Sequence, residues 1–381
     1  MKQRFLSLWL CVLIVPCGLA RAQCTLPSAP GLGTPDSSFD QFFQQNGPGW
    51  TGADGTFSIP LPDGTNLWMW ADSFIGSVNP LTRLRASYLI TAHNSLTIQN
   101  QEAGTLTTVG YPPNTSSYFV PANKSDWFWP GDATVVETSP GTYQIKMILQ
   151  EWTGVFHFVG DSVATLSWPE LSIESVEPIA LPDTTIEWGA KILQIDGVYY
   201  LYGILDPGTA HKLPYLARFQ SIDDLTQPSQ WEYWNASENQ WVAGQENATA
   251  LSGIPDITDD YTVSELSSSD TGTFFLMVGM DTESPSYPGW KYITTYYSCT
   301  PQGPWSNRTV VYVTPESGAR GCKLGQLYTY DPRAHPEFTE GEEILISYNV
   351  NALESKDLVC ANDYVPRFIQ VPIAGLLPGG Q

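Results

Sequence analysis

The stretch Trp188-Gly-Ala-Lys-Ile-Leu-Gln-Ile-Asp-Gly-Val-Tyr-Tyr-Leu-Tyr-Gly203 predicts two β-strands joined by a tight turn. Its β-branched and aromatic residues favour strands, and Asp196-Gly197 is a dipeptide typical of two-residue hairpin turns. The runs Tyr215–Phe219 and Trp231–Trp234 add two further strand candidates. This part of the chain therefore predicts a unit of four antiparallel strands.

A similar unit recurs loosely along the chain. Ser264–Gly279 predicts another hairpin, and strand candidates follow at Tyr292–Tyr297 and Val310–Tyr312. No segment shows a sustained apolar period of 3.6 residues. The first strands of five such units are expected to begin near Asp54, Asp132, Glu187, Glu265 and Tyr328. We therefore predict an all-β, five-bladed β-propeller in a single domain, with a jelly roll or two stacked β-domains as the alternative.

Residues 1–22 predict an export signal, and residues 23–381 the propeller domain. Lys2 and Arg4 precede the apolar run Phe5–Leu19, and Ala20-Arg21-Ala22 has the small-x-small pattern that signal peptidase cuts. No later run approaches the roughly 18 apolar residues that a membrane span needs. We therefore predict a secreted, soluble, monomeric protein with no membrane partner.

The charge balance excludes one class of partner. The chain carries 17 Lys and Arg against 39 Asp and Glu, which gives a formal net charge of −22. Such a charge repels nucleic acids and anionic membranes, so we expect neither as a partner. The low charged fraction (15%) and high aromatic fraction (13%) indicate a folded chain rather than a disordered one.

The cysteines predict disulfides. Four remain after removal of the signal: Cys24, Cys299, Cys322 and Cys360. In an exported protein an even number predicts two bridges, for which three connectivities exist. We expect a local Cys299–Cys322 bridge and a Cys24–Cys360 bridge between the chain ends. In a eukaryotic host, five sequons predict a glycoprotein: Asn114, Asn123, Asn235, Asn247 and Asn307.

Acidic residues mark four of the five expected strand starts: Asp54, Asp132, Glu187 and Glu265. A propeller brings the first strand of every blade to one axis, so these carboxyl groups should converge. Clustered carboxylates repel one another, and glycoside hydrolysis is a reaction that uses them. One protonated carboxyl acts as the acid, and another carboxylate acts as base or nucleophile. Neighbouring aromatic rings raise the pKa of such an acid and stack on sugars. Tryptophans lie beside these acids: Trp50, Trp70, Trp127, Trp129 and Trp188.

Other interpretations stay open. Asp54-Gly55 and Pro130-Gly131-Asp132 are also turn sequences, and the tryptophans could pack between blades. A non-catalytic carbohydrate-binding propeller would use the same rings without paired acids. A polysaccharide lyase would need a Tyr or His base beside a cationic group. The four histidines show no metal-ligand spacing, so no cofactor is predicted. The one cation that we still consider is a calcium ion held by oxygen ligands on the axis.

The stretch Gly52–Gly76 resembles the opening of a group of exported five-bladed propellers, formerly a domain of unknown function, that includes bacterial endo-D-arabinanases. Further stretches resemble landmarks of that group: His93-Asn-Ser-Leu96, Trp127-Phe-Trp-Pro-Gly-Asp132, Tyr215-Leu-Ala-Arg218, Gly303-Pro-Trp305, and His335-Pro336 leading to Ser347-Tyr-Asn-Val-Asn351. The resemblance covers roughly residues 46–372.

This resemblance implies a glycosidase that cleaves furanosidic linkages, with α-D-arabinan as the expected polysaccharide partner. Asp54, Asp72 and Asp132 match the family's axial aspartates. Glu187 matches only the broader arrangement of five-bladed arabinanases and fructosidases, which place a general acid on the third blade. Ala71 before Asp72 departs from the family pattern, and this leaves the substrate open. We expect the substrate to contact Trp50, Trp70, His93, Asn94, Trp129, Trp188, Glu265, His335 and Asn349.

Overall fold

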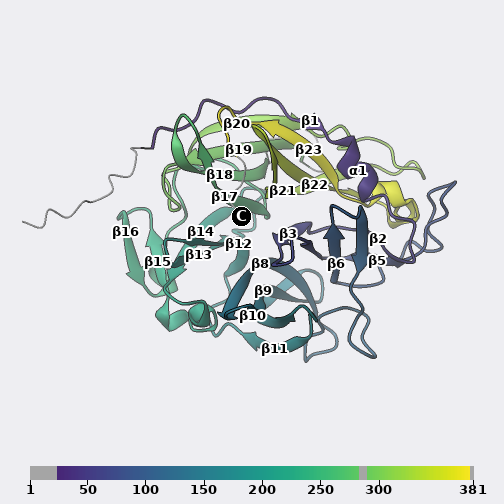
Figure 1. The fold of residues 1–381 in the computed structure, drawn as a ribbon, viewed down its shortest axis with the longest axis horizontal. Helices are drawn as coiled ribbons and strands as arrows, with labels where there is room; N and C mark the ends of the chain where they lie inside the picture. Colours follow the sequence, from purple (N-terminus) through teal and green to yellow (C-terminus); the bar gives the residue numbers. More distant parts are fainter. Residues whose placement is uncertain (1–23, 283–289, 378–381) are drawn as a thin grey trace, which may run out of the picture.

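The structure, a computed structural model, describes residues 24–282 and 290–377. The predicted export signal lies outside the described residues. Five antiparallel sheets stand around one axis, along which Figure 1 looks. The fold is a five-bladed β-propeller, as the recurring four-strand unit predicts. No described helix is long and apolar enough to cross a bilayer.

Each blade is one antiparallel sheet whose first strand lies nearest the axis. Blade 1 comprises β3 (Phe57–Pro60), β4 (Asn66–Trp70), β6 (Ser95–Asn100) and β7 (Thr105–Thr108). Blade 2 comprises β8 (Trp127–Ser139), β9 (Thr142–Thr153), β10 (His157–Trp168) and β11 (Ile173–Pro178). Blade 3 comprises β12 (Ile186–Ile195), β13 (Val198–Leu205), β14 (Leu213–Phe219), β15 (Glu232–Asn235) and β16 (Gln240–Ala243). Blade 4 comprises β17 (Tyr261–Ser268), β18 (Gly272–Asp281), β19 (Tyr292–Ser298) and β20 (Ser306–Val313).

Blade 5 combines the two ends of the chain. It comprises β21 (Leu327–Glu340), β22 (Glu343–Ala352), β23 (Arg367–Pro372) and the N-terminal β1 (Thr34–Pro35). The short strand β1 pairs with the edge of β23, with Thr34 opposite Gln370. Helix α1 (Ser37–Phe42) follows at once, and its N-cap Asp36 accepts hydrogen bonds from two helix N–H groups. The N-terminal segment therefore covers an open sheet edge and closes the ring.

The hairpin of blade 3 forms as its sequence predicts. Ile195 of β12 pairs with Val198 of β13, so the turn contains only Asp196 and Gly197. Both turn residues have positive φ angles, 51° and 82°, as a type I′ turn requires. This match between local sequence and backbone fixes the register of the two inner strands.

The disulfides join Cys24 to Cys299 and Cys322 to Cys360, so both expected pairings are wrong. Closure of the ring carries the N-terminal segment past blade 4, where Cys24 meets the end of β19. Cys322 precedes β21, and Cys360 follows β22. Because these strands are antiparallel, the start of one lies beside the end of the other. Both cysteines therefore sit at the same end of blade 5.

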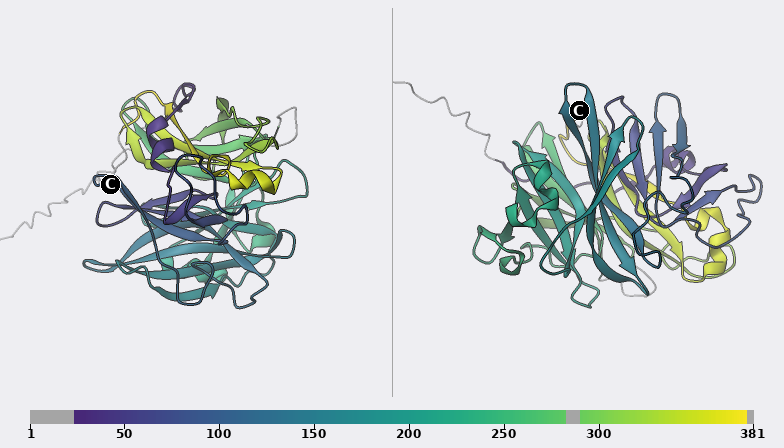
Figure 2. Two further views of the ribbon diagram at one scale, coloured as in Figure 1. Left: turned by 90° about the vertical axis from the view of Figure 1, so that its right-hand side faces the viewer. Right: turned by 90° about the horizontal axis from the view of Figure 1, so that it is seen from below.

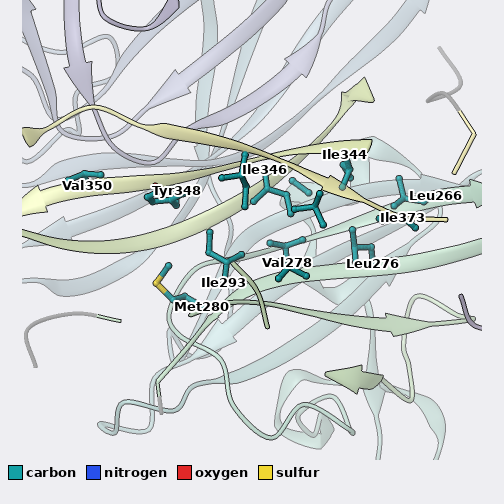
Figure 3. Close-up of a cluster of buried hydrophobic side chains, with 14 of the residues drawn as sticks. Leu266, Leu276, Val278, Met280, Ile293, Ile344, Ile346, Tyr348, Val350 and Ile373 are labelled. Carbon is teal, nitrogen blue, oxygen red and sulfur yellow. The ribbon is translucent and has the colours of Figure 1, made fainter. Parts of the chain in front are cut away.

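The hydrophobic core lies between neighbouring blades. Figure 3 shows the layer between blades 4 and 5, where apolar side chains of β18 face those of β22. Val278 and Ile346 in this layer are fully buried. Fully burying one such side chain stabilises a fold by about 1.5–3 kcal/mol, so layers of this kind hold adjacent blades together.

The inner strands β3, β8, β12, β17 and β21 contact one another in a ring (Figure 1). The starts of β3, β17 and β21 lie together, because Arg333 contacts both Gly55 and Asp260. In the right-hand view of Figure 2, blade 2 faces the viewer and its long strands run from one face of the molecule to the other. Two expected strand starts are corrected. Strand β8 begins at Trp127, before Asp132, and β17 begins at Tyr261, before Glu265. Residues just before these starts therefore meet at one face.

Candidate functional site

Asp54 and Asp72 form a carboxyl pair at the end of the axis where the inner strands begin. Asp54 lies between β2 (Gly49–Ala53) and β3, and Asp72 lies between β4 and β5 (Ser73–Gly76). The two segments are joined because Ala71 N–H donates to the Asp54 carbonyl oxygen at 2.9 Å. The structure thus brings together two acids that the sequence predicts as catalytic.

The Asp54 carboxyl group has an unusual environment. Its Oδ2 accepts hydrogen bonds from the hydroxyls of Tyr330 (2.6 Å) and Tyr364 (2.8 Å). Its Oδ1 is buried and accepts no hydrogen bond from the described residues. Burial and the charge of Asp72 raise the pKa of Asp54 to about 7, although the two phenols oppose this rise. A carboxyl group with such a pKa exchanges a proton near neutral pH.

Asp72 is held by two aromatic side chains. Its Oδ1 lies 3.0 Å from Trp129 Nε1, which donates, and 2.9 Å from His93 Nδ1. Both contacts fall on the same oxygen, and the side chain is 19% exposed. Trp129 and His93 thus contact Asp72, and their role in substrate binding stays a prediction. Their contacts orient the carboxyl group of Asp72 at the surface.

Glu187 enters the same face from the start of β12 in blade 3. Burial raises the pKa of Glu187 to about 8, and the charges of three nearby acids add to this effect: Asp259, Asp260 and Asp206. Lys212 opposes the rise and forms ion pairs of 2.7 Å with Asp206 and 3.1 Å with Asp259. Glu187 is therefore protonated at neutral pH, as a general acid requires.

Arg333 links the two halves of the site. Its Nε donates to the carbonyl oxygen of Gly55, next to Asp54. Its guanidinium also lies 2.8 Å from Oδ1 of Asp260 and stacks over the ring of Phe57. The side chain is almost completely buried, so this bridge fixes blade 1 relative to blade 4.

Asp331 completes the acidic face from the start of β21. Burial, followed by the charge of Asp260, raises the pKa of Asp331 well above its usual range, and Asp54 contributes to the same effect. The backbone of Asp331 has a φ of 48°, which is uncommon for a residue with a side chain. Blades 1, 3, 4 and 5 therefore each contribute at least one carboxyl group to this face.

Asp132 lies deeper in the axis than the sequence predicts. Its side chain is buried, forms an ion pair of 3.0 Å with Lys191 and accepts a hydrogen bond of 2.8 Å from Ile192 N–H. It lines a cavity of about 10 Å³, which has room for about one water molecule. Asp132 therefore joins β8 to β12 beneath the acidic face, and we do not include it among the reacting groups.

His335 and Asn349 are buried in the same deeper layer. The ring nitrogens of His335 lie 2.6 Å from Ser58 Oγ and 2.8 Å from Ser347 Oγ. Asn349 Oδ1 accepts a hydrogen bond of 2.6 Å from Thr56. These contacts join blade 5 to blade 1, which corrects their expected role in substrate binding.

Four further residues expected at the substrate lie in the interior: Trp50, Trp70, Trp188 and Asn94. The rings of Trp50 and Trp70 stand 4.6 Å apart in the core beside blade 1. Trp188 packs in the layer between blades 2 and 3. Asn94 hydrogen-bonds the backbone of Phe119 and Phe128. Their burial prevents contact with a sugar, so the expectation is corrected.

Glu265 is exposed inside β17 and lies beyond the acidic face. The strand starts earlier than expected, so the acids of blade 4 are Asp259 and Asp260, directly before Tyr261. Sequence reasoning missed these two, together with Asp331, Tyr330, Tyr364 and Arg333. The pair Asp259-Asp260 directly before β17 was a usable sign, because Glu187 is the second residue of the equivalent strand β12 in blade 3.

The described residues contain one group of three His, Cys, Asp or Glu side chains with ligand atoms within 4.8 Å of one another: Cys322, Cys360 and Asp363. Its two cysteines form a disulfide, so the group does not suit a metal ion. The acids of the axial face do not form such a group within residues 24–282 and 290–377. An axial calcium ion stays a prediction.

Solved structures share this architecture. A protein from Bacteroides ovatus ATCC 8483, provisionally named a hydrolase, is similar at a TM-score of 0.70 and 20% identity, over 92% of this chain and 97% of that one. This likeness concerns the fold alone. An exo-β-1,3-galactanase from Phanerochaete chrysosporium (TM-score 0.45, 12% identity, 85% of this chain and 63% of that one) is more distant. So is an endo-arabinase from Bacteroides thetaiotaomicron VPI-5482 (TM-score 0.46, 13% identity, 84% and 94%).

The sequence comparisons give one family. No curated protein matches the chain. A family match covers residues 36–373, which include helix α1 and every strand of the five blades except β1. The chain therefore belongs to the family described as "Domain of unknown function (DUF5005)".

Proposed function

We propose that this protein is a glycoside hydrolase whose reacting groups are Asp54, Asp72 and Glu187. One observation carries the proposal. Two carboxyl groups on different blades, Asp54 and Glu187, have pKa values raised by burial to about 7 and about 8, and both reach the same acidic face. A pair of carboxyl groups that exchange protons near neutral pH is what acid–base cleavage of a glycosidic bond requires.

The environments of the acids suggest their roles. Glu187 accepts no hydrogen bond from the described residues, and its raised pKa keeps the proton that a leaving oxygen needs. Asp54 is the base or nucleophile, because two phenol hydroxyls stabilise its charged form. The charge of Asp72 adds to the effect of burial in raising the pKa of Asp54, and Asp72 is held in place by Trp129. Catalysis then needs Asp54 charged and Glu187 neutral.

The substrate proposal rests on the sequence. The stretch Gly52–Gly76 resembles exported endo-D-arabinanases, so D-arabinan is the first polysaccharide to test. Secretion is part of the same proposal and rests on the predicted export signal. The site itself adds that the substrate is not strongly anionic, because carboxyl groups dominate the face.

Incubation with a panel of polysaccharides tests the proposal. Wild-type protein, Asp54→Asn, Glu187→Gln and the control Glu170→Gln would each be mixed with D-arabinan, L-arabinan, galactan and xylan. Glu170 is an exposed acid in the turn between β10 and β11, away from the site. We expect new reducing ends from the wild type and the control, and losses of about 10²–10⁴-fold in the two site variants.

The products separate the alternatives. A lyase would give unsaturated ends that absorb ultraviolet light, and a lectin would bind without cleavage. Full activity in Asp54→Asn or Glu187→Gln would refute the assigned roles. Thermal melts of all four proteins show whether a loss of activity reflects unfolding.

A further inference from the structure

A row of aromatic side chains extends from the carboxyl pair across blade 2. We call it the blade 2 platform and define it as Trp127, Trp129, Trp152, Phe156 and Phe158. Trp127 on β8 pairs with Trp152 on β9, which pairs with Phe158 on β10. The platform begins at the proposed site, because Trp129 Nε1 donates to Asp72 Oδ1.

The rings of the platform contact one another. Trp129 lies 5.8 Å from Trp127, 5.3 Å from Trp152 and 5.8 Å from Phe156, measured between ring centroids. Trp152 lies 5.4 Å from Phe158, and His93 stacks on Trp127 at 5.3 Å. None of these rings belongs to the hydrophobic clusters between the blades. The rings therefore form an aromatic surface of their own.

Phe156 is the clearest sign that this surface meets a ligand. This residue is 66% exposed at the tip of the β9–β10 hairpin, next to Val155, which is 90% exposed. Its φ of 53° places a bulky side chain in the left-handed region, where Gly or Asn would fit at lower cost. Strained residues of this kind concentrate at functional sites. Here the strain presents a phenyl ring above Trp129.

The charges beside the platform limit the ligand. Asp126 directly precedes Trp127, and Glu151 directly precedes Trp152. The charge of Asp126 contributes, after burial, to the raised pKa of Glu151, so the two acids lie near each other. An anionic sugar chain would be repelled here, whereas a neutral sugar presents apolar C–H faces that stack on indole and phenyl rings.

We propose that the blade 2 platform binds successive residues of a neutral polysaccharide whose reacting bond lies at Asp54 and Asp72. This inference rests on the proposed function, because it extends the same site outward. It predicts that long chains bind better than short ones. Loss of Trp152 or Phe156, the rings that make no hydrogen bond to the carboxyl pair, should then weaken binding of polymers more than binding of short substrates.

Binding can be measured without cleavage in a Glu187→Gln background. Arabinan, galactan and xylan serve as neutral probes and polygalacturonate as the anionic probe, in affinity electrophoresis and calorimetry. Phe156→Ala and Trp152→Ala remove platform rings. Trp241→Ala is the matched control, because Trp241 is a partly exposed tryptophan on the outer strand β16 of blade 3. Phe156→Gly is a second variant that suits the left-handed backbone.

We expect Phe156→Ala, Phe156→Gly and Trp152→Ala to weaken binding of at least one neutral polymer by about 3- to 10-fold, the loss of one aromatic contact. Trp241→Ala should bind as the background does. Unchanged binding in both Phe156 variants, or equal binding of polygalacturonate, would overturn the inference. So would an absence of binding to every polymer. A dimer in sedimentation that Phe156→Ala abolishes would identify a second copy as the occupant and overturn it as well.

The two proposals can fail separately. If the variants lose binding but the wild type cleaves no polymer, the platform inference stands and the hydrolase proposal fails. If the wild type cleaves polymers and the platform variants cleave long and short chains as well as the wild type does, the hydrolase proposal stands and the platform inference fails.

Discussion

The hydroxyl of Tyr364 donates a hydrogen bond of 2.8 Å to Oδ2 of Asp54, although 310 positions separate them in the sequence. The same hydroxyl lies 3.1 Å from the carbonyl oxygen of Asp72. Tyr364 thus contacts both segments of the carboxyl pair. Its O–H favours the charged form of Asp54, against the burial that favours the neutral form.

Replacement of Tyr364 by Phe should raise the pKa of Asp54. A hydrogen bond to a charged group contributes about 1.5–3 kcal/mol, so the acidic limb of the kcat/KM profile should move up by about 1–2 pH units. Activity at pH 6 should fall more than activity at pH 8. The pH dependence of kcat/KM on a cleaved polymer measures this shift.

The control for Tyr364→Phe is Tyr348→Phe. Tyr348 also donates to a carboxylate, at 2.9 Å to Glu316, and neither residue is among the groups that shift the pKa of Asp54. This control should keep the wild-type profile. An equal shift in both variants, or a shift in neither, would show that the Tyr364 hydroxyl does not set the pKa of Asp54.

The raised pKa values predict a narrow pH optimum. Asp54 must be charged, so activity should fall as the pH drops below about 7. Glu187 must be protonated, so activity should fall as the pH rises above about 8. The profile of kcat/KM should therefore be bell-shaped with its maximum between these values.

Glu187→Gln isolates the alkaline limb. This variant lacks the titrating proton, so its residual activity should no longer fall above about pH 8. Aryl glycosides with acidic leaving groups need little protonation and should lose less rate than polymers. An alkaline limb that persists in Glu187→Gln would assign that limb to another group.

The same carboxyl pair should reduce stability at high pH. The folded-state pKa of Asp54 is about 7, above the value of an unfolded Asp near 3.9. The folded state therefore binds the proton more tightly, and the stability this gives is lost as the pH rises from about 4 through 7. Asp54→Asn removes the buried charge and keeps an oxygen that accepts from Tyr330 and Tyr364.

Thermal melts check the direction of this effect of pH on stability. Asp54→Asn should unfold at a higher temperature than the wild type at pH 9, and the two melting temperatures should converge toward pH 4. Asp63→Asn, a change in the exposed turn between β3 and β4, gives the reference for a substitution outside the site. A lower melting temperature for Asp54→Asn at pH 9 would contradict the raised pKa.

The parts of this architecture that depend on residues close together in the sequence could be predicted. The Asp196-Gly197 turn needs only local backbone preferences, and the four-strand unit repeats them. The pairing of Cys24 with Cys299 depends instead on ring closure through β1, a strand of two residues that leaves almost no trace in the sequence. Closure is a long-range property, so composition and spacing do not reveal it.

The site was predictable to a similar degree. Asp54 and Asp72 lie in short connections next to strand ends, Glu187 is the second residue of β12, and these positions meet at one face. Trp70 and Trp129 look alike in the sequence, but one packs in the core and the other meets Asp72. The difference arises because strand parity and the bulge between Pro130 and Ala133 decide which way each ring points. These features depend on the sheet, so local sequence could not separate the two tryptophans.

Asp259 offers the most direct test of the electrostatics at Glu187. Its charge is the largest contribution, after burial, to the raised pKa of Glu187. Asp259→Asn removes that charge. It also takes away one of the two ion-pair partners of Lys212, whose positive charge favours the ionised form of Glu187. Both effects have the same sign, so the pKa of Glu187 should fall.

The alkaline limb of kcat/KM should therefore move to lower pH in Asp259→Asn, by about 0.5–1 unit for a charge near the surface. Added salt should reduce the difference from the wild type, because Asp259 is 52% exposed and its field is screened. Asp270→Asn, an exposed position in the turn between β17 and β18 beyond the acidic face, should leave the limb unchanged. A limb that stays in place or moves to higher pH in Asp259→Asn would show that the charge of Asp259 does not raise the pKa of Glu187.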